Sequence, residues 1–205
     1  MLKNIILDFD GVIADTFDVG WALAQEHDED ATLEKFLAHH DGNVFEEPQI
    51  KFKPERLPEF NAEYRRRVQP GHIERAREPI MRLGATYSLF VVSSNSEHGI
   101  AEVLKNAGVL HLFVRIMGLE THRSKVEKFK ILMAENGVTP ENTLFVTDTL
   151  GDIKEAEKVG IRTIAETFGF HDRERLAQGN PFRIADSWDE IEQIIEEDNS
   201  QERVE

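Results

Sequence analysis

The chain has 205 residues, of which 24 are Lys or Arg and 39 are Asp or Glu, so its formal net charge is −15. Apolar residues make up 40% and charged residues 31%, a balance typical of a soluble folded domain and not of a disordered chain. The negative charge disfavours nucleic acid and anionic membranes as partners, and the absence of cysteine excludes disulfides, thiolate nucleophiles and zinc–thiolate sites.

The first apolar run covers residues 4–9, and Asp10 and Gly11 behind it form a turn signal. A short apolar run without alternation predicts a strand that is buried on both faces. The pattern changes over residues 16–69, where apolar residues occur at helical spacing among many charges and prolines interrupt the middle. We expect this stretch to be a helical insertion without strands, with one of its helices over residues 59–68.

Helices and strands alternate beyond residue 70. In chain order we expect a helix over 73–83, a strand over 89–92, a helix over 97–106, a strand over 114–117, a helix over 124–137, a strand over 143–147, a helix over 152–159, strands over 162–165 and 182–184, and a helix over 188–196. Ser124 and Glu127 have capping-box spacing at the start of one of these helices. The alternation predicts an α/β fold with a parallel sheet.

Three of the expected strands end in polar residues. Asp8 and Asp10 follow the first, the run Ser93, Ser94 and Asn95 follows the second, and Asp148 follows the strand over 143–147. In an open parallel sheet, ligands bind beyond the carboxyl ends of the strands. We therefore expect these side chains to face one crevice although they lie far apart in the sequence.

The carboxylates of this group have the chemistry of an active site. One aspartate can act as a nucleophile while its neighbour two residues away transfers a proton. Asp8, Asp10, Asp148 and Asp152 together form an oxygen-only set that suits Mg²⁺. Each of them alone would be interpreted as a turn former or helix cap, but the four together argue against that interpretation.

A phosphate could be bound beside these carboxylates. The serines and Asn95 precede a helix that begins near residue 97, and helix N-termini bind phosphate through free N–H groups. Lys125 is our candidate for the cation that offsets the carboxylates, with Lys128 and Lys130 as alternatives nearby.

Taken in order, these residues resemble the motifs of the haloacid dehalogenase-like hydrolase superfamily. The sequence DFDGVIADT over residues 8–16 is similar to the first motif, and VVS over 91–93 is similar to the second. Lys125 is the candidate for the third motif, although Val126 stands where many relatives have proline. The sequence VTDTLGD over 146–152 resembles the fourth. Residues 70–71, 167–171 and 184–191 are similar to phosphoglycolate phosphatases within the superfamily.

The resemblance implies a Rossmann-like core formed by residues 1–15 and 70–198, a small helical C1 cap over 16–69 inserted after the first strand, and a polar tail over 199–205. It also implies Mg²⁺-dependent phosphoryl transfer, in which Asp8 is the nucleophile and Asp10 the acid and base. The implied metal ligands are Asp8, Asp10, Asp148 and Asp152. The implied phosphate-binding residues are Gly11, Ser93, Ser94, Asn95 and Lys125.

Three functions remain open from the sequence. The first is a phosphatase acting on a small phosphorylated metabolite, and the second is a sugar phosphomutase of the β-phosphoglucomutase type. The third is a non-catalytic binding or regulatory module on the same fold. The chain has no leader-like or membrane-spanning apolar run, so we expect a cytoplasmic monomer or homodimer without a nucleic-acid or membrane partner. We expect His27, His39 and His40 to be ordinary surface residues.

Overall fold

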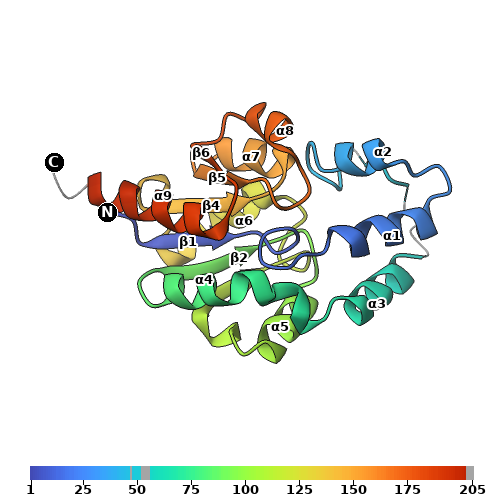
Figure 1. Cartoon of the computed structure of the whole chain (residues 1–205), viewed down its shortest axis with the longest axis horizontal. Coiled ribbons are helices and arrows are strands. Elements are labelled where there is room, and N and C mark those ends of the chain that lie inside the picture. Colours follow the sequence, from blue (N-terminus) through green and yellow to red (C-terminus); the bar gives the residue numbers. More distant parts are fainter. Residues whose placement is uncertain (47, 52–55, 202–205) are drawn as a thin grey trace.

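The central feature of the molecule is one parallel sheet. The computed structural model describes residues 1–46, 48–51 and 56–201. In this part of the chain six strands follow the order β3-β2-β1-β4-β5-β6 (Figure 1). The strands are β1 (Asn4–Leu7), β2 (Ser88–Val92), β3 (Phe113–Met117), β4 (Thr143–Thr147), β5 (Arg162–Glu166) and β6 (Arg183–Ala185). The α/β fold with a parallel sheet, predicted from short apolar runs, is confirmed.

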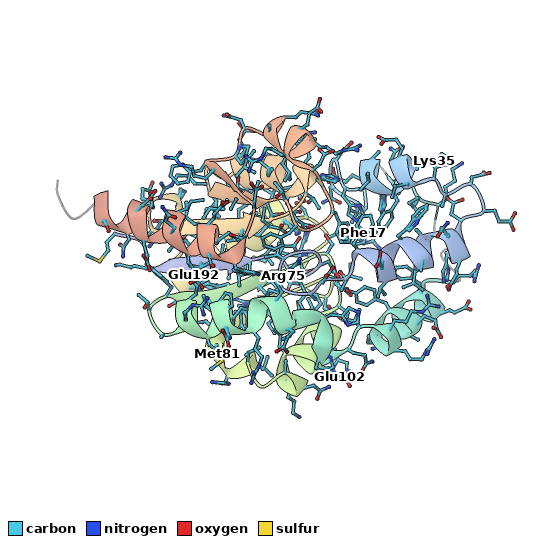
Figure 2. The ribbon with its side chains drawn as sticks, viewed as in Figure 1. Phe17, Lys35, Arg75, Met81, Glu102 and Glu192 are labelled. Atoms are coloured by element: carbon cyan, nitrogen blue, oxygen red, sulfur yellow. The ribbon has the colours of Figure 1, made fainter. Side chains whose placement is uncertain are left out.

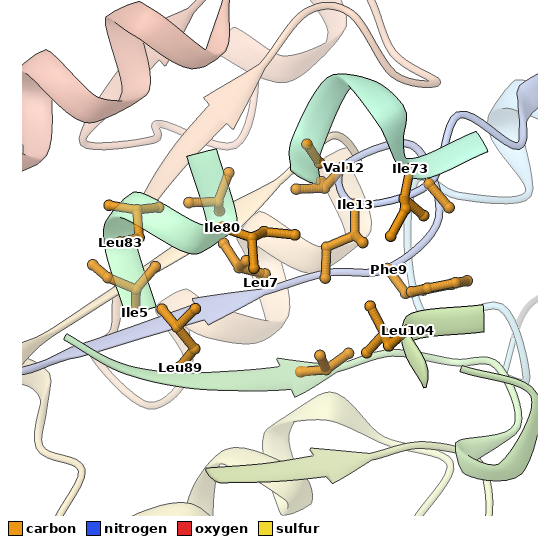
Figure 3. Close-up of a cluster of buried hydrophobic side chains, with 14 of the residues drawn as sticks. Ile5, Leu7, Phe9, Val12, Ile13, Ile73, Ile80, Leu83, Leu89 and Leu104 are labelled. Atoms are coloured by element: carbon orange, nitrogen blue, oxygen red, sulfur yellow. The ribbon is translucent and has the colours of Figure 1, made fainter. Parts of the chain in front are cut away.

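Strand β1 is buried on both faces because helices cover both sides of the sheet. Ile5 and Leu7 pack with Ile80 of α4 (Glu74–Gly84) (Figure 3). The same cluster includes residues of α9 (Trp188–Gln201). Ile6 faces the opposite side and packs in a second cluster with Phe129 of α6 (Lys125–Asn136). This two-sided cover explains why the strand is apolar without alternating.

The remaining core helices complete the two layers. They are α5 (Glu97–Asn106), α7 (Leu150–Glu157) and α8 (Arg173–Ala177). Helix α9 extends to Gln201, so residues 199–201, which were expected in a polar tail, are helical, and residues 202–205 lie outside the described part. No helix among the described residues is both long and apolar enough to span a bilayer.

The predicted capping box at the start of α6 is wrong. The Ser124 hydroxyl donates to Glu155 Oε1 at 3.0 Å instead of capping its own helix. Glu127 pairs with Lys130 at 2.7 Å on the helix surface. Ser124 and Glu127 have the spacing of a capping box, but the Glu155 carboxylate of the neighbouring helix α7 binds the Ser124 hydroxyl instead.

Helices α1 (Phe17–His27), α2 (Leu33–Ala38) and α3 (Leu57–Arg67) lie between β1 and β2 in the sequence. They extend from the end of the sheet where the strands finish (Figure 1). A small cluster of their own buries Phe36, and the ring of Phe170 from the core lies 5.7 Å from it. Figure 2 shows Phe17 at the junction with the core, where its ring lies 5.4 Å from that of Phe170. Residues 47 and 52–55 of the expected cap lie outside the described part.

The backbones of the helical insertion and the core meet at two glycines. The Gly151 N–H of α7 donates to the carbonyl of His40 at 2.9 Å. A Cβ atom on Gly151 would lie 2.4 Å from the carbonyl oxygen of Gly42. Only a residue without a side chain allows this approach.

The expectation that the histidines of the insertion are surface residues is wrong. His27 and His39 are buried, and His40 is half-buried with its ring 4.9 Å from the ring of Phe170. The insertion packs its α2 end against the core, where the His40 ring lies beside the rings of Phe170 and His171, whereas the His27 ring packs on Phe60 within the insertion.

Candidate active site

The candidate site begins directly beyond three adjacent strands. Strands β2, β1 and β4 end at Val92, Leu7 and Thr147, so Ser93, Asp8 and Asp148 are the first residues after them. The Asp8 N–H still donates to Val146 O at 3.0 Å, and all three side chains are buried. The topology therefore brings together residues that the sequence separates by more than half the chain, as predicted.

Lys125 occupies the centre of this group. Its Nζ lies 2.8 Å from Oδ2 of Asp8 and 2.5 Å from Oδ2 of Asp152. Of the two alternatives, Lys128 is buried and donates to the Ser93 carbonyl, and Lys130 pairs with Glu127 on the surface. Lys125 is thus the lysine that contacts the carboxylates.

Burial and charge have opposite effects on the pKa values of Lys125, Asp8 and Asp152. Burial raises the pKa of Asp8 well above its usual range, although Lys125 opposes the shift. Burial acts in the same direction on Asp152, but the Lys125 ammonium and the Thr147 hydroxyl, which donates at 2.7 Å, hold its pKa below the usual value. The two carboxylates outweigh burial at Lys125 and raise its pKa. Lys125 and Asp152 thus each favour the charged form of the other.

Asp10 lies beside this trio and is held by donors from three elements. Its Oδ1 accepts hydrogen bonds from the Thr16 hydroxyl at 2.8 Å and from the Tyr64 hydroxyl of α3. Its Oδ2 accepts from the Asn95 amide at 3.2 Å. Burial, and then the neighbouring Asp10 charge, raise the pKa of the Tyr64 phenol well above 10. Tyr64 is thus a hydrogen-bond donor that the insertion supplies to the site.

Asp148 is fitted into the site by two glycines. Gly11 has a positive φ of 78°, and a Cβ atom there would lie 1.8 Å from Asp148 Oδ2. A Cβ atom on Gly169 would lie 2.4 Å from the same oxygen. The Phe170 N–H donates to Oδ2 at 2.8 Å, whereas Oδ1 is buried and has no hydrogen-bond partner among the described residues. Gly11, expected to contact phosphate, therefore makes room for a carboxylate.

The residues present suit a hard divalent cation. Burial, Glu166 and Asp8 all raise the pKa of Asp148, which a bound cation would reverse. No three His, Asp or Glu side chains in the described part converge closely enough to hold an ion by themselves. Mg²⁺ accepts such a site, because it keeps several waters and takes one or two carboxylates. The unpartnered Asp148 oxygen is a buried atom in the described part of the structure that fits such an ion.

The loop between β2 and α5 reaches Asp10 through the Asn95 side chain. The Asn95 N–H donates to the Ser93 hydroxyl at 3.1 Å, and the Asn95 amide oxygen accepts from the Ser96 N–H at 2.7 Å. Ser94 is half-buried between them. At the start of the ten-residue helix α5, the Glu97 N–H donates to Glu120 Oε2 and the Ser96 hydroxyl donates to Glu120 Oε1, each at 2.8 Å. The Glu120 carboxylate thus occupies the helix N-terminus that was expected to bind phosphate.

Sequence reasoning missed four residues of this region. Thr16 and Tyr64 contact Asp10, Glu155 accepts the Lys125 N–H at 2.9 Å, and Glu166 lies beside Asp148. The spacing of Phe60 and Tyr64 on one helix is equally typical of core aromatics. The fifth strand, expected over residues 162–165, extends to Glu166.

Comparison with known proteins agrees with this geometry. The family model described as haloacid dehalogenase-like hydrolase matches residues 5–166. The chain is 29% identical over 107 residues to the phosphoglycolate phosphatase of Synechococcus elongatus, a match that covers 52% of this chain and 50% of that protein. The chain thus spans about half the length of the curated relatives it matches.

Solved structures show the same fold over nearly the whole chain. A haloacid dehalogenase-like family hydrolase from Streptococcus pneumoniae superposes with a TM-score of 0.75 at 17% identity, covering 95% of this chain and 98% of that one. A β-phosphoglucomutase from Clostridium difficile gives a TM-score of 0.73 at 17% identity and covers 100% of both chains. At these identities the likeness describes the fold alone.

Proposed function

Because the chain belongs to the haloacid dehalogenase-like hydrolases, whose family model spans residues 5–166, we propose that it is a Mg²⁺-dependent phosphatase of small phosphorylated metabolites. The observation that carries the proposal is the position of Lys125 between Asp8 and Asp152, directly beyond the strand ends that also present Asp148. The similarity to phosphoglycolate phosphatases supports a phosphomonoester as substrate.

Asp8 is the proposed nucleophile. The Phe9 N–H donates to its Oδ1 at 2.7 Å and Lys125 holds Oδ2 at 2.8 Å, so the orientation of the carboxylate is fixed. Attack on phosphorus forms the bond of an aspartyl-phosphate and breaks the bond from phosphorus to the ester oxygen. The departing oxygen keeps the electron pair and takes a proton from Asp10.

The second half of the reaction reverses the role of Asp10. A water molecule loses its proton to Asp10 and attacks phosphorus, which releases inorganic phosphate and restores the Asp8 carboxylate. Thr16, Tyr64 and Asn95 orient Asp10 for both proton transfers. Lys125 and the loop over residues 93–95 would bind the oxygens of the phosphoryl group.

The proposed cation would be held by Asp8, Asp148 and the backbone carbonyl of Asp10, with Asp152 behind them. When bound, it neutralises negative charge between the nucleophile and the phosphate. The raised pKa values of Asp8 and Asp148 support this assignment, because each reports buried negative charge that its surroundings do not balance.

The test is phosphate release from a panel of phosphoglycolate, sugar phosphates and nucleoside monophosphates, with Mg²⁺ and with a chelator. We expect metal-dependent release that Asp8→Asn abolishes. Conversion of one phosphosugar into another without phosphate release would replace the proposal with a phosphomutase. Release that persists in a clean Asp8→Asn preparation would rule out the covalent mechanism.

A further inference from the structure

Glu166 is a buried carboxylate that the proposed mechanism does not use. It is the last residue of β5 and has no solvent exposure. Its Oε2 accepts the Phe168 N–H at 2.6 Å, but its Oε1 has no hydrogen-bond partner among the described residues. A buried carboxylate oxygen without a hydrogen-bond partner is energetically unfavourable, so we expect a ligand at this atom.

Asp148 repeats this arrangement on the adjacent strand. One of its oxygens accepts the Phe170 N–H at 2.8 Å, and the other is buried and unpartnered within the described part of the chain. The N–H groups of Phe168 and Phe170, two residues apart on one loop, thus orient one oxygen of each carboxylate. Carboxylates that bind metal ions are commonly oriented by hydrogen bonds in this way.

The two carboxylates approach the same point. A Cβ atom on Gly169 would lie 2.4 Å from Asp148 Oδ2 and 2.6 Å from Glu166 Oε1. Glycine therefore stands at the position where a side chain would fill the space between them. Their closeness also raises the pKa of Asp148.

The nearby cationic side chains, Lys125 and Arg75, make contacts with other groups. Lys125 is paired with Asp8 and Asp152. The Arg75 guanidinium donates to the Gly11 carbonyl at 3.0 Å and lies 4.3 Å from the centre of the Phe168 ring. Burial raises the pKa of Glu166 to about 8, although the Phe168 N–H and then the Arg75 guanidinium oppose the shift. Neither cation contacts the free oxygen of Glu166 in the described structure.

We propose that Glu166 is an additional residue of the cation site, where its carboxylate and that of Asp148 share one divalent ion together with water. This inference rests on the proposed function only in placing a divalent cation at Asp148. Glu166 adds an oxygen donor and a negative charge to the residues of the four motifs. The site should therefore bind divalent ions more tightly than those motif residues alone would.

Direct metal binding tests the inference without substrate or turnover. Metal-free protein is titrated with Mn²⁺, and the unbound ion is followed by electron paramagnetic resonance. We expect Glu166→Gln to weaken Mn²⁺ binding by roughly tenfold or more, the effect usual for residues that support a metal site. Glu192→Gln is the matched control, because that glutamate of α9 pairs with Arg82 of α4 and its substitution should leave the affinity unchanged.

Thermal unfolding gives a second readout. Without metal, Glu166→Gln removes repulsion from Asp148 and should raise the melting temperature above that of the wild type. With saturating Mn²⁺ the wild type should gain more than the variant does. Glu166→Met, which removes the charge and the polar group together, should show the same pattern.

The possible failures are distinguishable. If Glu166→Gln binds Mn²⁺ within twofold of the wild type while Asp148→Asn loses binding, Glu166 is not part of the site and the inference is wrong, but the proposed function stands. If the wild type itself binds neither Mn²⁺ nor Mg²⁺, both this inference and the proposed Mg²⁺ dependence fail.

Discussion

The ammonium of Lys125 lies 2.8 Å from the carboxylate of Asp8, and both side chains are almost completely buried. Asp152 contacts the same nitrogen at 2.5 Å, so one cation serves two carboxylates. Removing a charge from a buried group of this kind costs more than removing a surface ion pair.

We therefore expect Lys125→Met to lower phosphate release by about 100-fold or more, because charge stabilisation at the phosphoryl group is lost. The free energy of unfolding should also fall, since Asp8 and Asp152 remain buried together. Activity is measured as phosphate release and stability by urea unfolding. Lys130→Met on the exposed face of α6 should leave both unchanged. Full activity in a folded Lys125→Met protein would remove Lys125 from the site.

Gly11→Ala should impair both folding and activity. The positive φ of 78° disfavours any side chain, and the added methyl would lie 1.8 Å from Asp148 Oδ2. Gly108→Ala is a matched control, because its φ is 80° but no atom lies within 4 Å of its Cβ position. The control should lose about 1 kcal/mol from backbone strain alone. Gly11→Ala should lower the free energy of unfolding by more than the control does. Equal losses would show that Asp148 can move away from the added methyl group at no energetic cost.

Tyr64→Phe tests the donor that the helical insertion supplies to Asp10. A hydrogen bond to a charged group contributes about 1.5 kcal/mol, so its loss should reduce kcat roughly tenfold. The ring remains stacked on Phe60, and the melting temperature should stay close to that of the wild type. Tyr87→Phe, whose hydroxyl accepts from Asn199 on α9, should leave kcat unchanged. A reduced melting temperature with normal kcat would make Tyr64 a packing residue.

The buried histidines of the insertion should make stability fall in acid. Burial lowers the pKa of His39 to about 4 and that of His40 to about 3, below the unfolded value near 6.5. Between the folded and unfolded pKa values, the unfolded chain binds more protons than the folded protein does. The stabilisation that comes from the neutral histidines is therefore complete above pH 6.5 and is lost as the pH falls towards 3.

His40→Asn should reduce the slope of unfolding free energy against pH between pH 6.5 and 4 by up to about 1 kcal/mol per pH unit. The asparagine amide can replace the ring nitrogen that lies 2.9 Å from the Phe36 carbonyl. Urea unfolding across this range measures the slope. Substitution of the exposed His111 by asparagine should leave it as in the wild type. An unchanged slope in His40→Asn would mean that His40 is protonated without cost in the folded state.

Local patterns predicted much of the core. The apolar run at residues 4–9 reveals a two-sided strand because both of its faces are covered. Asp8 and Asp148 could be assigned to one crevice because parallel strands end at the same edge of a sheet. Such rules depend on neighbours along the chain, which a single sequence provides.

The remainder of the site depends on contacts that no local pattern encodes. Glu166 looks like an ordinary polar residue at a strand end, and its importance comes from Asp148 on the adjacent strand. Tyr64 occupies a position typical of a core aromatic until α3 is placed over Asp10. The Ser124 hydroxyl is redirected by Glu155 of another helix. In each case the deciding partner lies on another element of the fold.

The central place of β1 in the sheet has a consequence for biosynthesis. This strand is made before its neighbours β2 and β4, which begin at Ser88 and Thr143. The nascent strand therefore leaves the ribosome with both of its apolar faces exposed, and Asp8 meets Lys125 only after more than a hundred further residues have been translated. Non-local pairing of this kind slows folding and favours aggregation of incomplete chains. Translation that stops before β4 should yield insoluble fragments.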